Sequence, residues 1–227
     1  MIIAGIDEAG RGPVLGPLVV AGVSIEAADE HKLKTIGVRD SKELSPSRRE
    51  KLAKEIEKVA GNIFVLKVGP CKIDRMRREG TNMNEIELNK FAEIMNFLLP
   101  EKLFVDAPDV NAKRFGEELS AMADRKIEVV AEHKAENKFP VVAAASIIAK
   151  VTRDAEVEEL RKKYGIRGSG YPSDPETIDW MKEYYAAHKK WPEKTVRETW
   201  DTAVQIMGGS RQSGITRWLM KKAGKTH

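Results

Sequence analysis

Three apolar runs near the start of the chain have the length and composition of buried β-strands. They cover residues 2–6, 18–25 and 63–68 and are rich in Ile, Val and Leu. Branched side chains favour strands because they fit well on a pleated surface. Over residues 45–59, apolar positions recur every three or four residues after a Ser-Pro pair that suits a helix start. The pattern predicts a strand meander interrupted by one helix.

The middle of the chain alternates between helix-like and strand-like segments. Apolar positions repeat at helical spacing over residues 84–99 and 111–123, and short β-favouring runs follow them at residues 103–106 and 127–131. Strand–helix–strand alternation is typical of parallel pairing, because the helix carries the chain back to the same end of the sheet. A long helix is then predicted over residues 141–164, with a glycine at its end.

The last quarter of the chain is predicted to be helical and then to lose its pattern. Residues 173–176 resemble a capping box that opens one helix, and a further helix is predicted over residues 195–207. Gly208, Gly209 and Ser210 interrupt the pattern, and the basic end is expected to be a separate tethered element. The expected units are an α/β domain over residues 1–172, a helical extension over residues 173–207 and a basic tail over residues 208–227.

Composition narrows the class of protein only a little. The 227 residues include 39 basic and 35 acidic side chains, a net charge of +4, which permits nucleic-acid binding without demonstrating it. Cys71 is the only cysteine, which excludes an internal disulfide and a thiolate zinc site. No apolar run reaches membrane-spanning length, and the first residues, which pass straight into the first strand, lead us to expect no signal segment. We therefore expect a soluble, cytoplasmic monomer that has no membrane partner.

The strongest chemical signal is a set of carboxylates at predicted strand ends. Asp7 and Glu8 end the first strand, and Asp106 ends the strand over residues 103–106. Converging carboxylates repel one another unless a divalent cation neutralises them, and oxygen-only ligands suit Mg²⁺ or Mn²⁺. Two such ions about 4 Å apart would stabilise the attacking and the leaving oxygen of a phosphodiester displacement. The sequence thus predicts metal-dependent phosphodiester chemistry.

A turn rich in glycine follows directly and suits a phosphate-containing ligand. Gly10 and Gly12 lack Cβ atoms, so the backbone N–H groups can approach a ligand closely, and Arg11 between them carries a permanent charge suited to phosphate. Carboxylates, glycines, prolines and an arginine follow one another over the whole of residues 5–17, and a motif of this length is rarely accidental.

Together these motifs resemble the type 2 ribonucleases H, the ribonuclease HII family, and its archaeal members most closely. The resemblance covers about residues 2–202. It implies an α/β fold, a ribonuclease H-like mixed sheet of about five strands flanked by helices, with a C-terminal helical extension. The matching segments, in order, are residues 5–17, 40–44, 105–108, 131–135, 143–151 and 168–174.

The resemblance implies an endoribonuclease that uses two Mg²⁺ or Mn²⁺ ions. Such an enzyme hydrolyses the RNA strand of RNA–DNA hybrids and cuts 5′ of ribonucleotides embedded in duplex DNA, leaving 5′-phosphate and 3′-hydroxyl ends. Its catalytic and metal-binding carboxylates are expected at Asp7, Glu8, Asp106 and Glu136. The last of these departs from the family pattern, which has aspartate there. Glu136 is either a fourth ligand on a longer side chain or a surface glutamate beside a three-ligand site.

The substrate residues that the resemblance implies lie in three motifs. Gly10, Arg11, Gly12 and Tyr171 are expected at the junction of ribose and deoxyribose, where the 2′-hydroxyl is sensed. Tyr171 lies in a Gly-Ser-Gly-Tyr-Pro loop that would present its ring for stacking, although a core tyrosine in a tight turn is the alternative. Lys42, in the Asp-Ser-Lys motif, is a candidate for phosphate contact.

The basic tail contains a possible partner-binding segment. Gln212, Ile215, Trp218 and Leu219 resemble the glutamine–aliphatic–aromatic box by which replication proteins dock on the sliding clamp. An amphipathic end that contacts its own protein is the alternative.

Two other functions remain open at the level of sequence. A DNA recombination nuclease on the same fold would not require the 2′-hydroxyl, and a non-catalytic hybrid-binding or clamp-tethered scaffold would not require the carboxylates. A chimeric substrate that lacks the 2′-hydroxyl distinguishes the first of these from the ribonuclease.

Overall fold

A five-stranded mixed sheet forms the centre of the protein. The computed structural model describes residues 1–38 and 44–208. The strand order is β3-β2-β1-β4-β5, in which β1 pairs antiparallel with β2 and parallel with β4. The other neighbours, β2 with β3 and β4 with β5, pair antiparallel and parallel respectively. The strands are β1 (Ile2–Ala9), β2 (Leu18–Glu26), β3 (Asn62–Val68), β4 (Lys102–Asp106) and β5 (Glu128–Glu132). The predicted mixed α/β sheet is confirmed.

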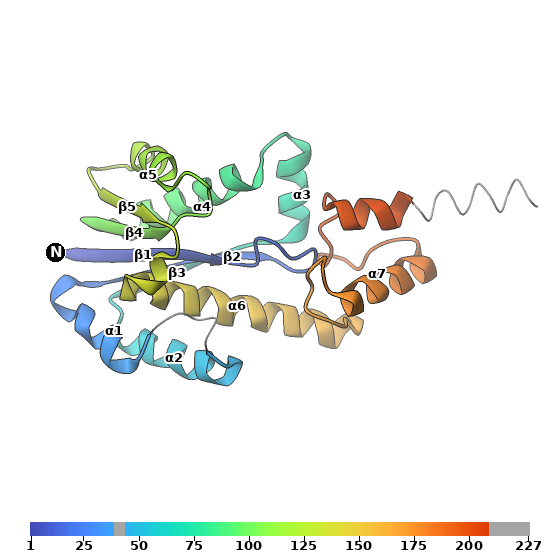
Figure 1. Ribbon diagram of the computed structural model, residues 1–227, viewed down its shortest axis with the longest axis horizontal. Coiled ribbons are helices and arrows are strands. Elements are labelled where there is room, and N and C mark those ends of the chain that lie inside the picture. Colours follow the sequence, from blue (N-terminus) through green and yellow to red (C-terminus); the bar gives the residue numbers. More distant parts are fainter. Residues whose placement is uncertain (39–43, 209–227) are drawn as a thin grey trace, which may run out of the picture.

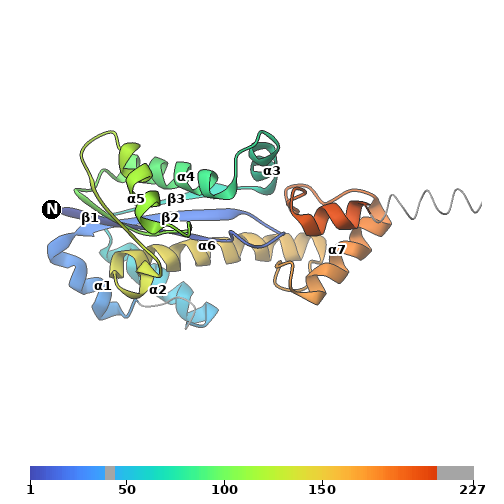
Figure 2. The ribbon, with the colours of Figure 1, turned by 45° about the horizontal axis from the view of Figure 1, so that its top comes forward.

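Helices cover both faces of this sheet (Figures 1 and 2). One face packs against α1, α2 and α6, and the other packs against α3, α4 and α5. The α-helices are α1 (Glu30–Ile36), α2 (Pro46–Val59), α3 (Pro70–Arg78), α4 (Met83–Leu98), α5 (Ala112–Ala121), α6 (Pro140–Tyr164) and α7 (Pro175–His188). Short 3₁₀ turns, η1 (Ala27–Asp29) and η3 (Ala135–Asn137), precede α1 and α6.

Strand β1 is buried on both faces, and this determines how closely helix α6 approaches it. Ile3 contributes to the core on the α6 side, whereas Ala4 and Ile6 contribute to the core on the α4 side. A Cβ atom on Gly5 would lie 2.3 Å from the backbone carbon of Val141. Only glycine therefore allows the start of α6 to lie against the strand that carries Asp7 and Glu8.

The structure differs from the sequence pattern in three helices. Helices α1 and α3 were not predicted, because both are short and charged side chains dominate their sequences. The helix predicted over residues 195–207 was wrong at its start, since residues 201–208 are helical and the preceding segment is not. Val196 instead forms a β-bridge with Leu15, and backbone bonds to the turn after β1 compete with helix formation.

A third apolar cluster lies at the far end of α6, beside α7 (Figure 1). It joins Trp180 and Met181 of α7 to Ala203, and it also includes Val14 and Leu15 from the turn after β1. The C-terminal helices thus pack on the segment that follows the carboxylates. Within the part of the chain that the structure describes, no helix is both long and apolar enough to cross a membrane.

Candidate active site

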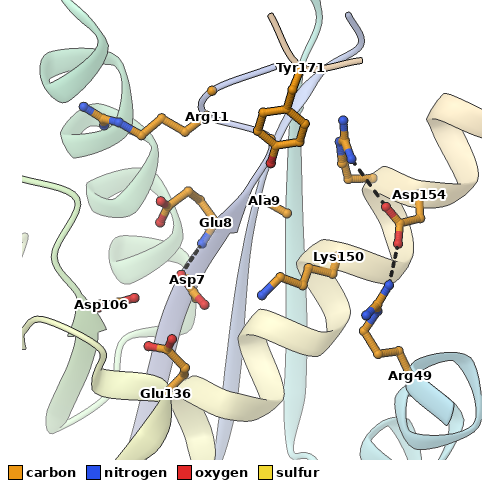
Figure 3. Close-up of a pocket in the computed structure, with 13 residues that line it drawn as sticks. Asp7, Glu8, Ala9, Arg11, Arg49, Asp106, Glu136, Lys150, Asp154 and Tyr171 are labelled. Atoms are coloured by element: carbon orange, nitrogen blue, oxygen red, sulfur yellow. Dashed lines mark hydrogen bonds and ion pairs between the residues drawn. The ribbon is translucent and has the colours of Figure 1, made fainter. Parts of the chain in front are cut away.

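The parallel pairing of β1 with β4 brings the strand-end carboxylates together. Ile6 is the partner of Val105 in this register, so the next residues, Asp7 and Asp106, lie side by side on neighbouring strands. Glu136 reaches the same place from η3, just before α6. In Figure 3 the carboxylates of Asp7, Asp106 and Glu136 point toward one another, and that of Glu8 points to the other side of β1.

Burial makes negative charge unfavourable at these carboxylates. Burial raises the pKa of Asp7, although two groups on α6 oppose the shift. Burial, followed by the charges of Asp7 and Asp106, raises the pKa of Glu8 well above its ordinary value. The pKa of Asp106 rises to about 7, because of burial first and then because of Asp7 and Glu136. In the absence of a cation, the cluster therefore retains protons at a pH where isolated carboxyls would have lost them.

The structure excludes a surface position for Glu136, and its role as a fourth ligand stays a prediction. Its side chain is buried, with only 4% of the residue surface exposed, so it is not a solvated loop glutamate. It also raises the pKa of Asp106 by a side-chain hydrogen bond and by its charge, which places the two carboxyls in contact. The longer side chain is thus part of the cluster.

The donor set suits a hard divalent cation. Oε2 of Glu8 is a buried acceptor that has no hydrogen-bond partner, and burial together with the charges of Asp7 and Asp106 raises the pKa of this carboxyl. As the side chains stand, no group of three or more His, Cys, Asp or Glu residues within residues 1–38 and 44–208 is arranged to hold a metal ion. The carboxylate chemistry fits Mg²⁺ or Mn²⁺, and binding would require these side chains to move closer together.

The carboxylates form one end of a cavity of about 450 Å³ whose opposite wall is basic. Lys150 and Arg153 of α6 and Arg49 of α2 line this wall, together with Asp154. Asp154 forms ion pairs with Arg49 at 3.1 Å and with Arg153 at 3.5 Å. We expect a carboxylate-bound cation at one end and cations at the other to suit a phosphodiester.

The sequence interpretation missed these basic residues, although α6 carried a signal. Ser146, Lys150 and Arg153 follow one another at spacings of four and three residues, so they share one helix face in an otherwise apolar run. Ser146 lowers the pKa of Asp7 by a hydrogen bond, and Lys150 lowers it by its charge. No comparable signal marked Arg49, because α2 is charged along most of its length.

Tyr171 stands over the glycine-rich turn at the mouth of the cavity (Figure 3). A Cβ atom on Gly12 would lie 3.4 Å from the tyrosine ring, and the Arg153 guanidinium lies 5.9 Å from the ring centre. Tyr171 is 43% exposed, which is incompatible with a core tyrosine. The ring is therefore accessible to a ligand that enters the cavity.

Arg11 differs from the expectation that its charge faces phosphate. Its guanidinium points away from the carboxylates toward α4, where it forms an ion pair with the fully buried Glu87 and donates to Asn84 Oδ1 at 2.6 Å (Figure 3). A buried carboxylate needs a compensating charge, and Arg11 supplies it. The side chain thus anchors the turn, and only the backbone of Gly10, Arg11 and Gly12 remains as a candidate substrate contact.

The remaining candidate residues cannot be placed. Lys42, and the tail residues Gln212, Ile215, Trp218 and Leu219, lie outside the described residues.

Comparisons with known proteins agree with the motifs. The family model for ribonuclease HII matches residues 4–203. A ribonuclease HII of Pyrococcus horikoshii is 46% identical over 95% of this chain and 97% of its own length. The crystal structure of ribonuclease H2 from Pyrococcus horikoshii superposes with a TM-score of 0.88 at 46% identity, covering 93% of this chain and 99% of the other. The structure of a PCNA:RNase HII complex from Archaeoglobus fulgidus gives 0.81 at 49% identity, with 90% and 96% covered. With its fold, its motifs and nearly its whole length in agreement, the chain belongs to the ribonuclease HII family.

Proposed function

We propose that this protein is a metal-dependent endoribonuclease that hydrolyses the RNA strand of RNA–DNA hybrids and cuts 5′ of ribonucleotides in duplex DNA. The products are 5′-phosphate and 3′-hydroxyl ends. Membership of the family supports ribonuclease H activity. The observation that carries the finer proposal is the single cavity that joins the carboxylates to the glycine-rich turn and Tyr171.

The carboxylates supply the hydrolytic end of this cavity. Asp7, Glu8, Asp106 and Glu136 would hold one or two Mg²⁺ or Mn²⁺ ions, which provide Lewis-acid stabilisation of the charge that develops on the phosphodiester. Asp7 and Glu136 are buried, and reduced contact with water strengthens the charge interactions that these two carboxylates make. Lys150 on the facing helix balances part of the negative charge before substrate binds.

The turn and the tyrosine supply the selective end. RNA differs from DNA at a given site by the 2′-hydroxyl, which both donates and accepts a hydrogen bond. The backbone of Gly10 and Gly12 lines the cavity and would meet the ribose there, and Tyr171 offers a flat apolar surface to the next sugar or base. Arg49 and Arg153 are placed to contact backbone phosphates beside the cut.

A replication sliding clamp is the proposed protein partner. The relative from Archaeoglobus fulgidus forms a complex with PCNA. The segment in this chain that suits such a partner comprises Gln212, Ile215, Trp218 and Leu219.

The test is a cleavage assay on three matched duplexes of the same sequence. One contains a single ribonucleotide in DNA, one is a continuous RNA–DNA hybrid and one is all DNA. Each is incubated with Mg²⁺, with Mn²⁺ and with a chelator, and the product ends are identified by phosphatase and ligase treatment. We expect cleavage of the first two duplexes with either metal and none with the chelator.

Each alternative function has its own signature in this assay. Equal cleavage of the all-DNA duplex would indicate a DNA nuclease, and binding of the hybrid without cleavage under any metal condition would indicate a scaffold protein. Cleavage 3′ of the ribonucleotide, or with a 2′,3′-cyclic end, would contradict the proposed metal-dependent hydrolysis.

A further inference from the structure

A fully buried arginine from the C-terminal part of the chain forms hydrogen bonds to the glycine-rich turn. Arg197 has no exposed surface, and its Nε donates to the carbonyl of Gly16 at 3.0 Å. Its Nη1 donates to the carbonyl of Arg11 at 2.9 Å, and its Nη2 donates to that of Gly10 at 2.5 Å. A guanidinium suits this task because its donors lie in one rigid plane.

The arrangement is energetically costly for a purely structural residue. Among residues 1–38 and 44–208, no carboxylate forms an ion pair with Arg197. Burial, and then the charge of Arg153, lowers its pKa to about 9. Asp74 offsets part of this effect by its charge, but a buried arginine without an ion-pair partner is rarely the most stable way to fill a core. Arg197 provides hydrogen bonds to the turn, and an apolar residue could not provide them.

Trp200 completes the contact at the third carbonyl. Its indole Nε1 donates to the carbonyl of Gly12 at 3.2 Å, and the Arg197 guanidinium lies 4.8 Å from its ring centre. The buried Asp74 of α3 accepts hydrogen bonds from the backbone and the hydroxyl of Thr199, which fixes the segment that carries both side chains. Consecutive carbonyls of the turn are thus all held by residues 197–200.

Holding the carbonyls leaves the opposite, N–H side of the turn available. Within the described residues, the N–H groups of Gly10, Arg11 and Gly12 have no hydrogen-bond acceptor, and these three residues line the cavity. N–H groups that no protein acceptor occupies can donate to a ligand that enters the cavity.

We infer that Arg197 and Trp200 are positioning residues that orient the Gly10–Gly12 turn so that its N–H groups meet the substrate, and that discrimination of a ribonucleotide depends on them. The inference rests on the proposed function and deepens it, because it places the control of selectivity in the C-terminal segment rather than in the cavity wall.

The first experiment measures selectivity in conservative variants. Arg197→Lys keeps the charge but loses the planar set of donors, and Trp200→Phe keeps an aromatic ring but loses the N–H that donates to Gly12. Arg125→Lys is the matched control, since Arg125 donates to the carbonyl of Leu99 in a loop that does not line the cavity. The readouts are kcat and KM for the single-ribonucleotide duplex and the binding constants for that duplex and its all-DNA counterpart.

We expect Trp200→Phe to lower kcat/KM for the ribonucleotide duplex about 5- to 10-fold, as loss of one hydrogen bond does, and Arg197→Lys to lower it by about 10²-fold. Affinity for the all-DNA duplex, which depends on phosphate contacts, should change less than twofold. A fall in affinity for both duplexes by the same factor would overturn the inference, since it would indicate general destabilisation. Unchanged values in both variants would overturn it as well.

The second experiment observes the turn without any substrate. We expect the ¹⁵N order parameters of the Gly10 and Gly12 amides to fall from the rigid range, about 0.85, to below about 0.6 in Arg197→Lys but not in Arg125→Lys. If wild-type protein showed no preference for a ribonucleotide while these amides became mobile, the proposed function would fail and the positioning role would stand. Rigid amides in Arg197→Lys would remove the positioning role whatever the substrate.

Discussion

At the residue scale, four carboxylates of similar chemistry face different surroundings. Asp7 receives a hydrogen bond from Ser146 and the charge of Lys150, whereas Glu8 faces burial and two like charges. Asp106 is less deeply buried and bonds to Glu136. These differences imply that the same Asp-to-Asn or Glu-to-Gln change has different effects on stability at different positions, although each removes a negative charge.

Asp7→Asn should separate activity from stability. We expect cleavage to fall on the order of 10³-fold or more, because the amide is a poor ligand for a hard cation. The melting temperature in the presence of a chelator should stay the same or rise, because a repulsive buried charge is removed. The measurements are single-turnover cleavage and thermal unfolding. Activity within threefold of wild type at saturating metal would show that Asp7 is not a ligand.

The titration of Asp106 gives the metal-free protein a pH-dependent stability. Its pKa is raised from 3.8 to about 7 in the folded state, so the folded state binds the proton more tightly than the unfolded state. This contribution is complete below about pH 4 and is lost as the pH rises through about 7. With a chelator present, wild-type protein should therefore melt at a lower temperature at pH 8 than at pH 5. Asp106→Asn should reduce that drop by about 2–4 °C, and an identical drop in both proteins would contradict the assignment.

At Glu136, a change in side-chain length is expected to alter the metal-dependent cleavage rate. If its extra methylene places the carboxylate about 1 Å from the best position, Glu136→Asp should raise the Mg²⁺-dependent rate, by at most about 10²-fold. Glu136→Gln should lower the rate, and Mn²⁺, which tolerates irregular coordination, should narrow the gap between wild type and Glu136→Asp. Steady-state rates with each metal provide the measurement. Equal rates for all three proteins would make Glu136 a bystander.

At the element scale, the loop between α6 and α7 sets the position of Tyr171. Gly168 and Gly170 adopt φ values of 75° and 86°, which favour glycine, and the carbonyl of Gly170 accepts from the N–H of Val14 at 2.9 Å. Asp174 accepts from the N–H of Ser169 and also caps α7. The loop is therefore joined both to the turn after β1 and to the helix that follows it.

Tyr171→Ala should impair cleavage at a single ribonucleotide more than cleavage of a continuous hybrid. Stacking on the deoxyribose at the junction exists only in the first substrate, and stacking contributes about 1–3 kcal/mol per base by alanine substitution. We expect kcat/KM to fall at least tenfold on the single-ribonucleotide duplex. On the hybrid, the fold-change should be less than half as large. Tyr171→Phe is the control, because it keeps the ring. Equal losses on both substrates would assign Tyr171 a structural role.

At the scale of the whole molecule, the site is built from both ends of the chain. Arg197 and Gly16, which follows the turn after β1, are 181 residues apart in the sequence. They are nevertheless joined by a buried hydrogen bond. The apolar cluster beneath them joins Val14 and Leu15 to α7. Folding of the C-terminal helices is thus coupled to the geometry of the turn beside the carboxylates.

Removal of residues 210–227 should abolish binding to the sliding clamp of the source organism and leave cleavage of short duplexes unchanged. These residues follow the last described helix and lie beyond the family match, which ends at residue 203. Trp218→Ala in the full chain should weaken binding at least tenfold, because aromatic anchors dominate such interfaces. Calorimetric titration with the clamp checks both. Unchanged affinity of the truncated protein would show that the tail is not the docking segment.

Much of the fold and most of the carboxylate cluster could be predicted from the sequence alone. Strand and helix periodicity is local, and Asp7, Glu8 and Asp106 follow apolar strands whose parallel pairing brings their ends together. The long motif over residues 5–17 identified the family because its glycines and carboxylates are each required by the same local chemistry. Helices α1 and α3 escaped prediction because charged side chains hide their short apolar faces.

Only the tertiary structure decided where the arginines act. Arg11 pairs with Glu87 of α4 instead of facing the cavity, and Arg49 and Arg153 face the cavity although no motif marked them. Arg197 lies in a segment whose sequence predicted a helix, and its backbone follows the turn after β1 instead. A long charged side chain takes its partner from whichever element lies beside it, and that neighbour is decided by packing between residues distant in sequence.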